Sequence, residues 1–130
     1  MKTKMLLTSL FSILISVMSW VMNFGFIRFF CTAMLIPFVH AVIIFAFCVV
    51  AVSNLEYRKI RLYNFLFTIT YLIGNIFLPD VDEVGNIMFF GLIHNDILCN
   101  FGWVISTIAL MVHLILLVLQ VIEIILIKTN

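Results

Sequence analysis

Long apolar runs alternate with short polar breaks along this chain. A helix needs about 20 apolar residues to cross a bilayer, because the hydrocarbon core is about 30 Å thick and each residue rises about 1.5 Å. Four runs approach this length and predict helices over residues 5–24, 29–52, 62–78 and 100–127. Lipid leaves irregular backbone without partners, and the runs lack the alternation of barrel strands. We therefore expect an all-α membrane protein, with residues 1–130 forming one domain of four transmembrane helices in an antiparallel bundle.

Two prolines bear on the helix boundaries. Pro79 ends the third run, since the residue before a proline is driven out of helical geometry. Pro37 lies inside the second run and leaves an alternative, in which the first helix continues to about Phe30 and the second starts near Pro37, a favoured first-turn residue. The apolar segment 84–93 is too short to span, so we expect it at the outer interface or folded back over the helices.

Composition supports a lipid environment. The 130 residues are 65% hydrophobic and 10% charged, whereas soluble domains are about 25% charged. A globule of this size could not hide so much apolar surface from water. The net charge of +1 and the lack of a basic cluster among aromatic residues argue against a nucleic-acid partner.

The charged residues predict an orientation. With four crossings, one side of the membrane receives most of the basic residues, namely Lys2, Lys4, Arg58, Lys59, Arg61 and Lys128. The other side receives one basic and four acidic residues, namely Arg28, Asp80, Asp82, Glu83 and Asp96. The positive-inside rule then places both termini in the cytoplasm, as in a multi-pass protein of a bacterial inner membrane. The first run lacks a small-residue cleavage site, so we expect a retained helix and not a signal peptide.

Small polar residues recur at helical spacing in the first run. Intervals of three and four residues place them on one stripe, which consists of Ser9, Ser12, Ser16, Ser19 and Asn23. Such a stripe could line a pore. Small hydroxyl residues more generally allow helices to approach closely and to form hydrogen bonds with each other, so we favour a packing seam.

Four polar residues are expected near the middle of the bilayer. Ser16, His40, Tyr71 and His113 each lie about ten residues from the end of a predicted helix, which corresponds to about 15 Å. Two histidines at one depth could bind a haem. Because they have no spacing motif, we favour ordinary hydrogen-bonded packing and expect no cofactor and no metal site.

Other polar residues receive structural interpretations. Glu123 should form an anchoring ion pair with Lys128 or with the basic segment before the third helix. The acidic group Asp80, Asp82 and Glu83 could bind a cation weakly, but a solvated outer turn is favoured. Cys31 and Cys99 could pair near the outer edge, and no CxxC motif is present.

The sequence has no HExxH or GxSxG motif, no phosphate-binding glycine loop and no EF-hand pattern, so no enzymatic activity is expected. In size and hydropathy the chain is similar to small multidrug transporters, although those carry a glutamate inside the first helix and this chain does not. It is also similar in size to membrane immunity proteins against pore-forming bacteriocins. We expect a non-enzymatic accessory, interaction or protective protein whose partners are the lipid bilayer and another membrane protein or a second copy. The alternative is an oligomeric transporter or channel subunit with a polar path at the midplane.

Overall fold

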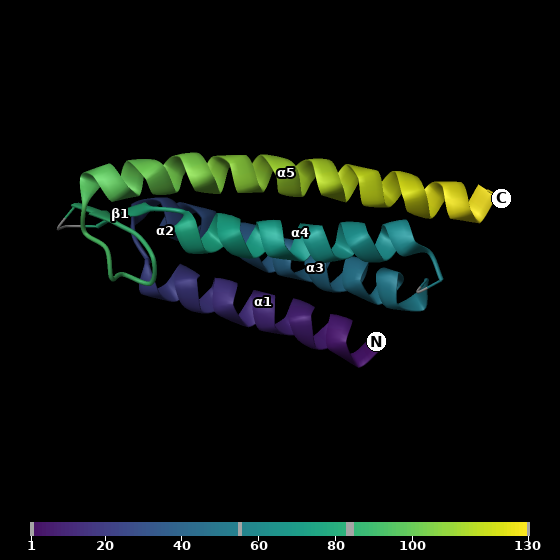
Figure 1. Cartoon of the computed structure of the whole chain (residues 1–130). Helices are drawn as coiled ribbons and strands as arrows, with labels where there is room; N and C mark the ends of the chain where they lie inside the picture. The colour runs from purple at the N-terminus through teal and green to yellow at the C-terminus, as the bar shows by residue number, and fades with distance from the viewer. Residues whose placement is uncertain (1, 55, 83–84, 130) are drawn as a thin grey trace.

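A computed structural model describes residues 2–54, 56–82 and 85–129 (Figure 1). The chain is mostly helical. Four helices are long and apolar enough to cross a membrane: α1 (Lys2–Met22), α3 (Ile36–Ser53), α4 (Arg58–Phe77) and α5 (Asp96–Thr129). A short helix, α2 (Phe26–Ala33), lies between α1 and α3. Two short strands, β1 (Asp80–Asp82) and β2 (Gly85–Ile87), form an antiparallel pair that the sequence did not predict.

The long helices run side by side, and successive ones point in opposite directions (Figure 1). In this view α1 lies on one side of the α3 and α4 pair, and α5 lies on the other. The start of α1, the connection from α3 to α4 and the end of α5 share one end of the molecule. We call it the basic end, because it carries Lys2, Lys4, Arg58, Lys59, Arg61 and Lys128. The opposite end, which holds α2 and the strands, is the hairpin end.

The second predicted span is divided into two helices. A break at Met34 and Leu35 separates α2 from α3, and Leu35 adopts a left-handed backbone conformation with φ of 58°. Pro37 then lies in the first turn of α3, where its missing N–H costs no helical hydrogen bond. The prediction of a single helix over 29–52 was therefore wrong, whereas the alternative prediction that a long helix starts near Pro37 is confirmed. The first helix ends at Met22 and does not continue to Phe30.

Two further boundaries differ from the sequence prediction. The third long helix starts at Arg58 and not at residue 62, so its first turn carries basic residues that the sequence placed before the helix. The last helix starts at Asp96, and its 34 residues correspond to about 50 Å, well beyond a ~30 Å hydrocarbon core.

The most extensive contact between helices joins α4 to α5. A buried cluster contains Ile44, Phe67, Tyr71 and Leu116 from α3, α4 and α5. Gly74 permits this approach, because a Cβ atom there would lie 2.7 Å from a methyl carbon of Leu110. The Ser106 hydroxyl donates to the Gly74 carbonyl at 2.8 Å, so a side chain of α5 bonds to the backbone of α4.

Candidate functional site

Two histidines from different helices meet in the interior. The Nε2 atoms of His40 on α3 and His113 on α5 are 2.7 Å apart, which is hydrogen-bonding distance. His113 is fully buried and its Nδ1 lies 3.0 Å from the Phe67 carbonyl oxygen. The Phe67 ring stacks on the His113 ring with centroids 4.1 Å apart. The pair therefore connects three helices.

The hydrogen bonds define the protonation pattern of this pair. The Phe67 carbonyl can only accept, so Nδ1 of His113 must carry a proton and donate it. In a neutral imidazole the other nitrogen of His113 then accepts, and His40 donates through Nε2. From His40 the hydrogen bonds thus run through His113 to the Phe67 backbone carbonyl, which does not titrate.

This geometry is unlike that of a bis-histidine haem. Metal–imidazole bonds are about 2.0 Å long, so nitrogens on opposite sides of one ion stand about 4 Å apart. The two Nε2 atoms here are closer than that and bond to each other. Among the described residues, no group of three or more His, Cys, Asp or Glu side chains could hold a metal ion.

The other two midplane candidates lie next to the histidines or share a cavity nearby. The Tyr71 ring centroid is 4.9 Å from that of His40 and 5.7 Å from that of His113. Ser16 and Tyr71 both line a cavity of about 190 Å³ between α1, α3 and α4, together with Asn75. The structure thus brings His40, Tyr71 and His113 into contact, with Ser16 on the α1 side.

The polar stripe of α1 faces the other helices. Its five members are between 0% and 3% exposed: Ser9, Ser12, Ser16, Ser19 and Asn23. Near the hairpin end, the Ser19 hydroxyl donates to the Asn75 carbonyl of α4 at 3.0 Å, and the Asn23 side-chain oxygen accepts from the Gly91 N–H. These bonds join α1 to α4 and to the segment after β2.

The acidic segment contains a buried carboxylate, so the prediction of a solvated turn was wrong for Asp80. Asp80 is fully buried and accepts hydrogen bonds from the backbone N–H groups of Gly25, Ile27 and Arg28 at 2.9–3.1 Å. Gly25 is the residue just before α2, and Ile27 and Arg28 lie in its first turn, where a carboxylate is favoured by the helix dipole. The Asp82 side chain and Glu83 lie outside the described part of the chain.

Arg28 is the partner of this carboxylate and is also fully buried. Its Nε lies 3.9 Å from the Asp80 Oδ2 atom. Its guanidinium donates to the carbonyls of Ser19, of Asn75 at 3.2 Å and of Leu78 at 2.6 Å. Burial lowers the pKa of Arg28 to about 10, against the opposing effect of Asp80, so the guanidinium is charged at neutral pH. No spacing in the sequence links residues 28 and 80, so sequence reasoning missed this pair.

Glu123 pairs with the basic segment and not with Lys128. Its Oε1 atom lies 3.0 Å from Nζ of Lys59, at the start of α4. The Lys59 side chain is 71% exposed, so water and salt screen this pair. Further along α5, the Gln120 amide donates to the Phe47 carbonyl of α3 at 3.4 Å. Cys31, Cys48 and Cys99 are free thiols.

Comparisons of the chain with protein-family models, with curated proteins and with solved structures find no match.

Proposed function

We propose that this chain is a non-enzymatic multi-pass protein of a bacterial inner membrane that acts by binding another membrane protein, in an accessory or protective, immunity-like role. Both termini lie in the cytoplasm in this proposal. The gathering of six basic residues at one end supports that orientation through the positive-inside rule.

The main support for this proposal is that the buried polar side chains of α5 form hydrogen bonds to neighbouring helices. Ser106, His113 and Gln120 are each fully buried, and each bonds to a backbone carbonyl of α4 or α3. Side chains engaged in this way hold helices together and do not line a path for a solute. A rigid helical scaffold suits a protein that presents a surface to a partner.

The outward face of α5 is a suitable surface for such a partner. Ile108, Met111 and Ile115 follow one another at helical spacing and are 58–63% exposed. In a membrane such a row contacts lipid or another helix. The face of α1 that carries Phe11, Leu14 and Val21 offers a comparison, because it is similarly apolar and exposed.

Site-specific photocrosslinking in native membranes tests this proposal. A photoreactive residue at 108, 111 or 115 should give one discrete adduct with a second protein, and the same probe at 11, 14 or 21 should give mainly lipid adducts. Lipid adducts alone at all six positions would contradict an interaction role. An adduct with the mass of two copies would identify the partner as the chain itself.

One observation favours a second candidate, a small proton-coupled transporter or channel subunit. The hydrogen-bonded pair His40 and His113 lies next to the cavity lined by Ser16, Tyr71 and Asn75. An intramembrane ionisable residue is the minimum that proton coupling requires.

Reconstitution separates the two candidates. Under the main proposal, vesicles containing the protein should dissipate an imposed pH gradient no faster than empty vesicles, and the purified protein should be colourless. His113→Gln should keep the fold, because an amide can both donate to Phe67 and accept from His40. Proton flux that disappears in His113→Gln would establish the transporter instead, and a haem absorption band lost in the same variant would establish an electron-transfer role.

A further inference from the structure

A polar cavity of about 200 Å³ opens between α1 and α4 near the basic end. Two basic residues line it, Lys4 from α1 and Arg61 from α4. Ser9 and Asn64 line it as well, and these two side chains are only 1% and 3% exposed. Within the described part of the chain, neither the Ser9 hydroxyl nor the Asn64 side-chain oxygen has a hydrogen-bond partner.

Buried polar atoms without partners require an explanation, because a buried donor or acceptor that is left unsatisfied destabilises the fold. A ligand with both acceptor and donor groups would satisfy the two atoms in this cavity. The Ser9 hydroxyl can donate to a phosphate oxygen, and the Asn64 oxygen can accept from a ligand hydroxyl. The two cations favour a negatively charged ligand.

Backbone electrostatics at the same end favour an anion too. Both α1 and α4 begin here, and a helix N-terminus carries a partial positive charge. Neither helix has an acidic residue in its first turn, while both carry basic residues there. The basic side chains therefore lie beside the positive ends of the two helix dipoles, and a bound anion would offset the repulsion between these like charges.

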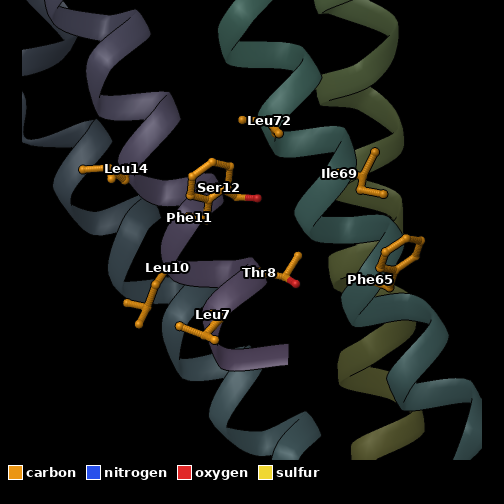
Figure 2. A pocket seen from close by; sticks show the side chains of 9 residues that line it. All are labelled: Leu7, Thr8, Leu10, Phe11, Ser12, Leu14, Phe65, Ile69 and Leu72. Carbon is orange, nitrogen blue, oxygen red and sulfur yellow. The ribbon is translucent and has the colours of Figure 1, made fainter. Parts of the chain in front are cut away.

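An apolar groove continues from the polar cavity along the same two helices. Its volume is about 600 Å³, and it shares Thr8 and Phe65 with the polar cavity. Figure 2 shows Thr8 in the space between α1 and α4, with Phe65 and Ile69 on α4 and Leu14 further along α1. From Lys4 to Leu14 the helix rises about 15 Å, which is half of a ~30 Å hydrocarbon core and so one leaflet.

We propose that this composite site binds one anionic phospholipid from the leaflet at the basic end. The phosphate lies beside Lys4 and Arg61, the Ser9 hydroxyl donates to it, and a headgroup hydroxyl donates to Asn64. One acyl chain occupies the groove that Figure 2 shows. Phosphatidylglycerol has both the charge and the hydroxyls, whereas phosphatidylcholine has a cationic headgroup without a hydroxyl. Basic pockets between transmembrane helices are suited to anionic headgroups in general.

Native mass spectrometry of the full-length protein in mixed micelles tests this site. With phosphatidylglycerol and phosphatidylcholine at equal concentration, we expect one phosphatidylglycerol to be retained in preference by about tenfold or more, given two cations near the headgroup. Lys4→Gln should lower this retention about fivefold, since a basic residue near an anionic headgroup contributes about that factor. The matched control is Lys2→Gln, which removes an exposed cation from the same turn that does not line the cavity.

Ser9→Ala distinguishes ligand binding from a structural role. Because the hydroxyl is buried and has no partner within the described residues, its loss should not lower the protein's stability in a zwitterionic detergent and should raise it slightly. Retention of phosphatidylglycerol should nevertheless fall. Equal retention of the two lipids, or equal effects of Lys2→Gln and Lys4→Gln, would overturn the proposal. Full displacement of the lipid by an equal concentration of glycerol 3-phosphate would also overturn it, by showing a phosphate site without an acyl-chain groove.

Discussion

At the scale of single residues, Arg28 and Asp80 serve as caps for three helices. The guanidinium of Arg28 donates to the Ser19 carbonyl in the last turn of α1 and to the Asn75 and Leu78 carbonyls at the end of α4, where helical donors run out. The first N–H groups of α2 lack acceptors, and the Asp80 carboxylate accepts from them. Each charge lies at the helix end whose dipole favours it. Gly25 permits this contact, because a Cβ atom there would lie 2.8 Å from the Asp80 carboxyl group.

Asp80→Asn should be strongly destabilising. The substitution leaves the buried Arg28 charge without its counterion, and removing one partner of a buried pair typically costs about 3–5 kcal/mol. The free energy of unfolding can be measured by denaturant titration in micelles, with circular dichroism as the signal.

The control for this substitution is Asp96→Asn. Asp96 is also acidic and near the hairpin end, but it is exposed and bonds only to the Asn86 amide among the described side chains. We expect a change within about 0.5 kcal/mol. Equal stabilities of Asp80→Asn and Asp96→Asn would show that the buried pair does not hold the hairpin end together.

At the scale of elements, the helical spacing of the serine stripe places its side chains where α1 contacts the other helices. Ser12 and Ser16 are 3% and 2% exposed on the face of α1 that meets the other helices. Small side chains of this kind let the backbones of neighbouring helices approach. The break between α2 and α3 separates the short helix that carries Arg28 from the long helix α3.

Replacing Ser12 and Ser16 together by leucine should destabilise the protein by about 2 kcal/mol or more through overpacking. Replacing both by alanine keeps the small volume and should cost less than about 1 kcal/mol. Unfolding in micelles measures both variants. If the alanine variant folds normally but loses function, the hydroxyls have a chemical role and the stripe is more than a seam.

At the scale of the whole molecule, the arrangement of helices predicts the topology. Both ends of the chain and the connection from α3 to α4 lie at the basic end, and the strands lie at the opposite end (Figure 1). Reporter fusions at residues 54 and 130 should therefore both report the cytoplasm, and a fusion at residue 82 should report the outside. A C-terminal fusion that reports the outside would contradict four crossings.

The sequence by itself determined the class of the protein and its number of long helices. Both follow from hydropathy, which can be read from each segment by itself. In lipid, any apolar segment of sufficient length must form a helix to satisfy its backbone hydrogen bonds. Local stereochemistry placed the start of α3, since the preference of Pro37 for a first turn depends on its own ring. The burial of the serine stripe is consistent with its helical period for the same reason.

Only the tertiary structure decided which polar groups meet. Arg28 and Asp80 are 52 residues apart, and His40 and His113 are 73 apart, so no local period relates the members of either pair. Their contacts depend on helix rotation and on the break between α2 and α3. The sequence offered two partners for Glu123, namely Lys128 and the basic segment before the third helix. The packing of α5 on α4 brings Glu123 to Lys59 of that segment. Hydropathy sets how deep a residue lies, but the fit of side chains between helices sets which neighbour it faces, and that fit exists only once the helices have packed.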